Sequence, residues 1–361
     1  MRIKIVTFFS SHNVGAMLQA YGLQHFLKKK INHVEILNYE DHQPKIFYKA
    51  RNIQTFMRNI IGLIYYKQLK VGYNRFESFL NDELWLTEAY NEFDELYQYN
   101  DADLMIVGSD QVWNPLNFRP IYFLDFVSNN TVKASYAASM GVSYVPEEIE
   151  SKYYSLLNQM DFISVRESNA KEILSKKTNL EINVNLDPTF LLSVNEWRKL
   201  QNSLDINQPF IFCYILYNPP WLNEYLKKLK NETGFNIVLI NNSGLRPVFN
   251  DICVRDAGPK EFLWLIDNAE IVVSSSFHGN VFSIIYEKEF YAVINPKSNS
   301  RIKNILDICN LQDREVTTAN SERIMLIDFD RVKKRINTEI SRSDKYLDNI
   351  ILSSKGTDYE C

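Results

Sequence analysis

Short apolar runs alternate with helix-length segments along most of this 361-residue chain. Runs of this length, separated by helical patterns, are typical of strands that lie parallel in a sheet with helices over both faces. The alternation predicts an α/β protein whose two halves are each a doubly wound, Rossmann-like sheet. The expected strands are residues 3–8, 34–38, 104–107, 134–138, 162–165, 210–216, 237–240, 271–275 and 291–294.

The two predicted halves are joined at residues 187–192. Pro188 disfavours helix at the residue before it, so the chain is expected to leave one sheet there and enter the next. This division gives an N-terminal domain of residues 1–192 and a C-terminal domain of residues 193–330. Residues 331–361 are predicted to form a charged, helical tail.

Composition excludes several classes of protein. With 45% hydrophobic and 23% charged residues, the chain is globular rather than disordered. A net charge of −4 argues against nucleic acid as a partner, because such binders carry a basic surplus. The four cysteines are widely spaced, which fits reduced thiols better than disulfides or a zinc site. No signal peptide or membrane-spanning run is visible, so a cytoplasmic protein is expected.

One stretch departs from the even charge distribution. Residues 43–76 contain seven basic residues and no acidic one. Their apolar side chains recur at helical spacing, so they share one face of a helix. Two interpretations stay open: a packed helix with a solvated basic edge, or an amphipathic face that contacts an anionic membrane surface or a lipid-linked acceptor. The apolar positions are Ile53, Phe56, Met57, Ile60, Ile61 and Ile64.

Ligands of open α/β sheets bind beyond the carboxyl ends of the strands, which singles out four turns. The first holds Asn13 and Gly15 at a helix start, where a ligand can meet free N–H groups or where Asn13 is a plain helix cap. The second, after residues 104–107, offers small, acidic, amide and aromatic groups that suit a sugar. Its alternative is a turn with a capping Asp110 and a core Trp113. The second turn comprises Gly108, Ser109, Asp110, Gln111, Trp113 and Asn114.

The other two turns suit an anion. Arg166 follows the fifth strand and can clamp a carboxylate or phosphate, or form a structural pair with a glutamate. His278 opens a helix after residues 271–275, where it can bind an anion and transfer a proton, or be a satisfied core histidine. Lys297 and Arg301 follow the next strand and can reach the same pocket, or lie in a solvated loop. The helix start also contains Ser276, Gly279 and Asn280.

Taken in order, these turns resemble the polysaccharide pyruvyl transferase family. The resemblance spans about residues 3 to 315 and implies a fold similar to B-type glycosyltransferases, with the active site in the cleft between the halves. It implies transfer of a pyruvyl group from phosphoenolpyruvate to a sugar of a surface polysaccharide or its lipid-linked precursor, as a cyclic ketal. The N-terminal domain would bind the acceptor and the C-terminal domain the donor. The matching stretches are residues 13–21, 108–114, 135–139, 164–167, 187–189, 274–279 and 300–302.

The resemblance also implies roles for individual residues. The family's donor-side arginine, histidine and lysine match Arg166, His278 and Lys297. Many members have Arg-Leu-His where this chain has Ser276-Phe277-His278, and Arg301 is expected to replace the missing arginine. His278 would act as general acid and Asp110 as general base or hydroxyl orienter. No cofactor or metal is expected, because cations and helix dipoles would hold the donor.

Two rival functions remain. A nucleotide-sugar glycosyltransferase could use the same fold, and a non-catalytic scaffold of polysaccharide assembly could keep a donor-like cleft. The set of Arg166, His278 and Lys297 at strand ends argues against a scaffold, which needs no such set.

Overall fold

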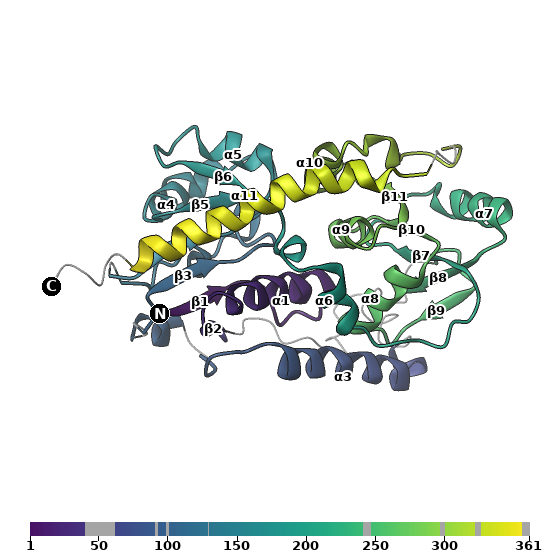
Figure 1. Ribbon diagram of the computed structural model, residues 1–361, viewed down its shortest axis with the longest axis horizontal. Helices are drawn as coiled ribbons and strands as arrows, with labels where there is room; N and C mark the ends of the chain where they lie inside the picture. The colour runs from purple at the N-terminus through teal and green to yellow at the C-terminus, as the bar shows by residue number, and fades with distance from the viewer. Residues whose placement is uncertain are drawn as a thin grey trace. The chain divides into compact units, whose positions relative to one another are not determined.

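The computed structural model describes residues 1–39, 62–90, 93–98, 101–128, 130–240, 247–296, 300–321 and 326–355 (Figure 1). The chain forms two compact units. Unit 1 comprises residues 1–43, 83–192 and 333–361, and unit 2 comprises residues 44–82 and 193–332. The change of unit after Leu192 falls where the sequence places it. Two segments differ from that prediction, because residues 44–82 belong to the C-terminal unit and the tail from Lys333 onward belongs to the N-terminal unit.

Unit 1 is built on a parallel sheet with the strand order β2-β1-β3-β4. The central strands are continuous apolar runs, since parallel strands are covered on both faces. Bridges from Ala134 to Phe162 and from Ala138 to Val165 continue the order to β5, which pairs with β6. The strands are β1 (Arg2–Val6), β2 (His33–Ile36), β3 (Leu104–Val107), β4 (Val132–Ser135), β5 (Ile163–Val165) and β6 (Ile182–Val184).

Helices and short 3-10 segments of unit 1 cover these strands. Trp113, Phe123 and Tyr153 form the centre of its core, with the Phe123 and Tyr153 rings 4.8 Å apart. The elements are α1 (Val14–Lys28), η1 (Phe93–Gln98), η2 (Pro115–Asn117), η3 (Pro120–Phe123), α4 (Glu147–Leu157), α5 (Ser168–Leu174), η4 (Pro188–Leu191) and, from Lys333, α11 (Phe329–Lys355).

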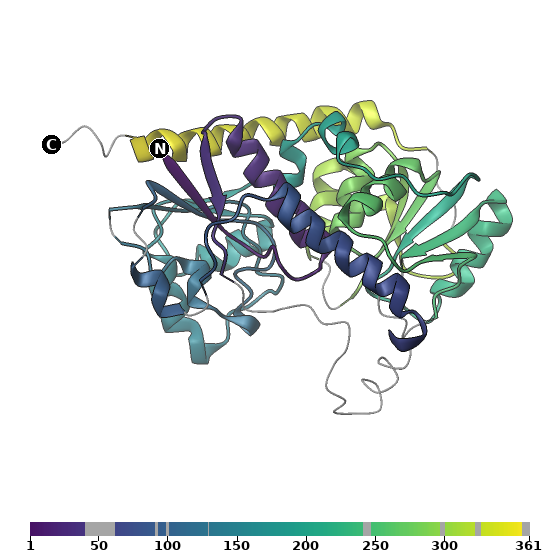
Figure 2. The ribbon, with the colours of Figure 1, turned by 90° about the horizontal axis from the view of Figure 1, so that it is seen from below.

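Unit 2 contains a six-stranded parallel sheet with the order β12-β11-β10-β7-β8-β9 (Figures 1 and 2). Alternate residues of β7 point to opposite faces. Ile211 packs in one core with Leu226 of α7, whereas Phe212 lies 6.0 Å from Phe262 of α8, so helices cover both faces. The strands are β7 (Phe210–Tyr214), β8 (Asn236–Ile240), β9 (Ile252–Val254), β10 (Ile271–Ser274), β11 (Glu289–Val293) and β12 (Glu315–Val316). The helices are α3 (Tyr66–Glu83), α6 (Val194–Lys199), α7 (Leu222–Thr233), α8 (Pro259–Asn268), α9 (Phe277–Ile285), α10 (Ser300–Cys309) and η5 (Gln312–Arg314).

The basic stretch is described only from residue 62, so Ile53, Phe56, Met57, Ile60 and Ile61 lie outside the described residues. In unit 2, residues 66–76 of the stretch form the start of α3. Arg75 donates to the Asp256 carbonyl at 2.8 Å and forms ion pairs with Asp256 and Glu261. Gly72 packs so closely that an added Cβ would lie 3.1 Å from the Asp256 Cα. These contacts explain why α3 belongs to unit 2.

The tail helix α11 packs into unit 1 because its apolar and small residues recur at helical spacing. Ser343, Tyr346, Leu347 and Ile350 are all buried. The Tyr346 hydroxyl donates to the Ser135 carbonyl at 2.8 Å, and the Leu186 N–H donates to Ser343 Oγ at 3.1 Å. The tail is therefore part of a core rather than a solvated extension.

Among the helices of the described ranges, none has both the length and the apolar content needed to cross a membrane.

Candidate functional site

A buried polar cluster lies at the carboxyl ends of β3 and β5 in unit 1. Arg166 Nη1 donates to Asp187 Oδ2 at 2.6 Å and to Ser109 Oγ at 3.1 Å, and Ser109 Oγ donates to the same carboxylate oxygen at 3.0 Å. The other oxygen of Asp187 accepts from the N–H and hydroxyl of Thr189 at 3.1 and 2.8 Å. This carboxylate is thus held by four donors in the protein interior.

Arg166 is only 3% exposed, and its ion-pair partner was not expected from the sequence. The structural alternative was a pair with a glutamate, but the neighbouring Glu167 accepts instead from Ser139 Oγ, the Met140 N–H and the Gly141 N–H, at 2.9, 3.0 and 3.2 Å. The charge of Arg166 is balanced by Asp187, and through this contact Arg166 joins the end of β5 to the segment at residue 187. Its expected role as a donor clamp stays a prediction.

Asp110 is the member of this cluster that reaches the surface. Its side chain is 13% exposed, and Oδ1 lies 3.9 Å from Arg166 Nη2. Its backbone has φ 73°, in the left-handed region that few non-glycine residues adopt. The Ser139 N–H donates to the Asp110 carbonyl at 2.9 Å and so holds this conformation. Backbone strain of this kind gathers at functional sites.

The turn after β1 adjoins the turn after β3. Gln19 Nε2 donates to Thr7 Oγ1 at 2.9 Å, and Thr7 Oγ1 donates to the Ser109 carbonyl at 2.9 Å. The Asn13 side chain accepts from the N–H groups of Gly15 and Ala16 at 2.9 and 3.3 Å, which caps α1. Asn13 Oδ1 and the Gly15 N–H therefore form the plain cap that was one of the two interpretations, and a ligand-binding role for this turn stays a prediction.

The structure also places three further residues of the β3 turn, among them Trp113, for which the sequence left a core role open. Trp113 is 0% exposed, and its Nε1 donates to the Tyr122 carbonyl at 2.7 Å, so it is a core residue and not a sugar platform. Gly108 is required by packing, because an added Cβ would lie 2.8 Å from Thr7 Cβ. Gln111 lies against Gly141, where an added Cβ would clash with Gln111 Nε2.

The second group of candidate residues lies in unit 2, where β10 leads into α9. Ser275 Oγ accepts from the N–H groups of Leu216 and Tyr217, each at 2.8 Å. Gly279 is again required by packing, since an added Cβ would lie 2.1 Å from Ser274 Oγ. Close packing against the end of β10 therefore explains the glycine, and its expected role in admitting a ligand to the backbone stays a prediction.

His278 and Asn280 lie in the first turn of α9, after the cap residue Ser276. Both are buried. Asn280 Nδ2 donates to the Ser276 carbonyl at 2.8 Å, and Asn280 Oδ1 has no hydrogen-bond partner within the described ranges. The nearby Tyr214 stays protonated, because burial raises its pKa to about 12. A helix start presents free N–H groups and a positive dipole, so this turn suits an anion.

The family model for polysaccharide pyruvyl transferase matches residues 13–298. The chain belongs to this family. The family is one of transferases, and the matched range includes both the cluster of unit 1 and the start of α9 in unit 2. A comparison with proteins of curated function gave no significant match.

Solved structures of other proteins share the fold of this pyruvyl transferase family member. A UDP-N-acetylglucosamine 2-epimerase from Rickettsia bellii is similar with a TM-score of 0.51 and 13% identity, over 99% of this chain and 97% of that one. The UDP-GlcNAc 2-epimerase of Methanocaldococcus jannaschii gives a TM-score of 0.50 and 12% identity, over 94% and 93% of the chains. The predicted α/β class with Rossmann-like parallel sheets is confirmed. The E. coli ADP-heptose lps heptosyltransferase II has a TM-score of 0.39 and 16% identity, over 95% of this chain and 100% of that one.

Two basic residues that are expected to bind the donor, Lys297 and Arg301, follow β11 in the sequence. Lys297 lies outside the described residues. Arg301 is the second residue of α10 and is half-buried. Both donor roles stay predictions. In the described parts of the chain, no three His, Cys, Asp or Glu side chains are grouped to hold a metal ion.

Sequence reasoning missed the residues that organise the unit 1 cluster. Asp187 was assigned only to the link between domains, and Thr7 and Gln19 were given no role. Asp187 did carry a signal, because it lies in one of the stretches that resemble the family. No local pattern pairs it with Arg166, since 21 residues separate the two.

Proposed function

We propose that this protein transfers the pyruvyl group of phosphoenolpyruvate to a sugar of a surface polysaccharide or its lipid-linked precursor. The product is a cyclic ketal, and inorganic phosphate is released. The observation that carries the proposal is the family match over residues 13–298, within which both groups of strand-end polar residues fall. No cofactor is required by this chemistry.

The start of α9 is proposed as the donor side. Phosphoenolpyruvate carries a phosphate and a carboxylate, and the free N–H groups of a helix start favour such anions. His278 lies in this turn as a residue that can both bind an anion and transfer a proton. Lys297 and Arg301 would add positive charge, with Arg301 in place of the arginine that is absent at Ser276.

The proposed reaction proceeds in two additions. His278 protonates C3 of the donor, and the oxygen of the first sugar hydroxyl bonds to C2 while Asp110 takes the hydroxyl proton. The bond from C2 to the phosphate oxygen then breaks, and phosphate leaves with that proton. The second hydroxyl adds to C2 and returns its proton to His278. Preorganised positive charge would supply most of the rate effect.

The proposal is tested by incubating the purified chain with phosphoenolpyruvate and candidate lipid-linked sugars. Release of phosphate together with a pyruvyl mass gain on the sugar supports it. Release of UDP or GDP from a sugar nucleotide would instead identify a glycosyltransferase. A melting temperature that phosphoenolpyruvate does not change would favour a scaffold.

The proposal includes contact with the inner face of an anionic membrane through the start of α3. Lys67 and Lys70 of α3 are exposed, and Leu63 and Ile64, which precede α3, are 67% and 68% exposed. Each lysine near an anionic surface contributes about 1 kcal/mol. The variant Lys67→Glu/Lys70→Glu should co-sediment far less with phosphatidylglycerol vesicles than the control Lys171→Glu/Lys176→Glu. Equal sedimentation of the two variants would rule out this contact.

A further inference from the structure

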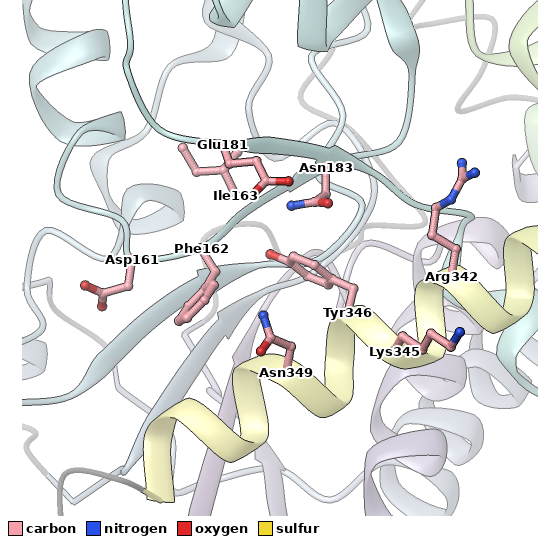
Figure 3. Close-up of a pocket in the computed structure, with 9 residues that line it drawn as sticks. All are labelled: Asp161, Phe162, Ile163, Glu181, Asn183, Arg342, Lys345, Tyr346 and Asn349. Carbon is pink, nitrogen blue, oxygen red and sulfur yellow. The ribbon is translucent and has the colours of Figure 1, made fainter.

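Unit 1 has a groove at the edge of the sheet opposite the polar cluster. It encloses about 450 Å³, which lies within the range of roughly 300–1,000 Å³ typical of ligand pockets. Its walls are the segment that enters β5, the edge strand β6 and one face of α11 (Figure 3). Asp161 and Glu181 precede their strands, whereas Arg166 follows β5, so the groove and the cluster lie at opposite ends of these strands.

Two aromatic residues line the groove. Figure 3 shows the Tyr346 ring between the amides of Asn183 and Asn349, and the Phe162 side chain on the segment that enters β5. The Tyr346 hydroxyl donates to the Ser135 carbonyl at 2.8 Å, which fixes this ring with its polar tip turned away from solvent. Tyr346 is 7% exposed, so only a small part of its surface lines the groove. Phe162 is half-buried and adds a second apolar surface.

Polar groups without a partner surround these rings. No hydrogen bond or ion pair within the described ranges engages the side chains of Asn183, Asn349, Glu181 or Lys345. A side-chain amide both donates and accepts, and the carboxylate and ammonium add one strong acceptor and one strong donor. Two other lining groups are partly engaged, because Arg342 pairs with Glu339 at 2.9 Å and Asp161 accepts from the Lys133 N–H at 2.8 Å.

The balance of charge decides between ligand classes. Two carboxylates and two cationic side chains line the groove, so it carries no net charge. A phosphate or nucleotide would meet the carboxylates, and an apolar ligand would leave the amides unsatisfied, which costs free energy. Neutral polyols have hydroxyls that donate and accept in turn and C–H faces that lie against aromatic rings. These groups match the lining best.

We infer that this groove is a second carbohydrate site, which binds a neutral segment of a polysaccharide away from the reacting sugar. The inference rests on the proposed function only for the source of the polymer, because the groove chemistry selects the ligand class. A bound segment here would raise the local concentration of the acceptor chain at the same unit.

The test is direct binding without phosphoenolpyruvate. Maltotetraose, cellotetraose and chitotetraose are titrated into the full chain by calorimetry and by saturation-transfer NMR. At least one should bind, and Asn183→Ala/Asn349→Ala should weaken that binding about tenfold, as expected for the loss of two hydrogen-bonding side chains. Asn337→Ala, an exposed asparagine of the same helix outside the groove, should bind as the wild type does.

Absence of binding by all three oligosaccharides would overturn the inference, and so would equal affinity of the wild type and the double variant. If the double variant melts at a lower temperature, the single variant Asn349→Ala, at an exposed helix position, decides by the same criterion. Phosphate release is measured separately from oligosaccharide binding. Absence of oligosaccharide binding therefore does not contradict the proposed reaction, and absence of phosphate release does not contradict binding in the groove.

Discussion

Arg166 illustrates how a residue's position and its partners give different information. Its place after β5 predicts a cation for the donor, whereas its partners in the structure are Asp187 and Ser109. Burial of both members of an ion pair is tolerated because Asp187 accepts from four donors. The guanidinium also lies close to the turn that carries Asp110, with Arg166 Nη2 3.9 Å from Asp110 Oδ1.

Replacement of Arg166 by glutamine should therefore destabilise the protein. Loss of one partner leaves the buried charge of Asp187 uncompensated, at a cost of about 3–5 kcal/mol in the free energy of unfolding. Urea unfolding measures the change, and the double variant Arg166→Gln/Asp187→Asn should recover part of it. A loss below about 1 kcal/mol, as for a surface pair, would contradict a structural role for the ion pair.

Substitutions at Asp110 can separate the contribution of its carboxylate to activity from the contribution of its backbone conformation to stability. Asparagine tolerates the left-handed region, so Asp110→Asn should fold as stably as the wild type but lose most activity. Alanine lacks that tolerance, so Asp110→Ala should lose about 1 kcal/mol of stability as well. Denaturant unfolding and phosphate release are measured on both variants. Full activity of Asp110→Asn would remove the carboxylate from the mechanism.

Acid sensitivity should come in part from Asp267 in unit 2. Burial alone would raise its pKa, but hydrogen bonds from Arg198 and Gln201 hold the pKa below its ordinary value. A lowered pKa adds stability above about pH 4 that is lost as the pH falls through the folded value. Asp267→Asn should thus cost up to about 1 kcal/mol at pH 6 and less at pH 3, in urea titrations. A difference that grows toward pH 3 would contradict this assignment.

At the scale of elements, α11 shows the limit of local patterns. Its composition is charged and its helix was predicted, but its role in the core of unit 1 depends on contacts with Ser135 and Leu186, which are far away in sequence. The same holds for the shortest strands. The strands β6, β9 and β12 were not predicted, and each lies at a sheet edge with two or three residues, too few to show periodicity.

The tail helix offers a matched pair of leucines. Leu347 is 0% exposed and Leu352 is 64% exposed on the same helix. Leu347→Ala should cost about 2–5 kcal/mol because it leaves a cavity, whereas Leu352→Ala should stay within about 0.5 kcal/mol. Chemical unfolding of the two variants measures the contrast. Equal losses would mean that α11 does not contribute its buried face to the core.

At the scale of the molecule, the alternation of strands and helices was enough to predict two parallel sheets and the change of unit after Leu192. It could not predict that residues 44–82 and the tail from Lys333 each belong to the other unit. Helix–sheet alternation is a local signal, whereas the unit that a helix joins depends on long-range packing such as that of Gly72 and Arg75 against Asp256. The same limit applies to the candidate site. The sequence indicated the turns at the strand ends, but it did not indicate which side chains bond to one another there, such as Arg166 and Asp187.

The central claim is pyruvyl transfer from phosphoenolpyruvate with His278 as the proton donor. The measurement is phosphate release by the full chain with phosphoenolpyruvate and a lipid-linked sugar acceptor, for the wild type and His278→Ala, with the melting temperature of each recorded. The account predicts acceptor-dependent phosphate release and a pyruvyl mass gain for the wild type, and neither for a His278→Ala protein that still folds. Turnover of His278→Ala at the wild-type rate, or wild-type release of a nucleoside diphosphate instead of phosphate, would contradict it.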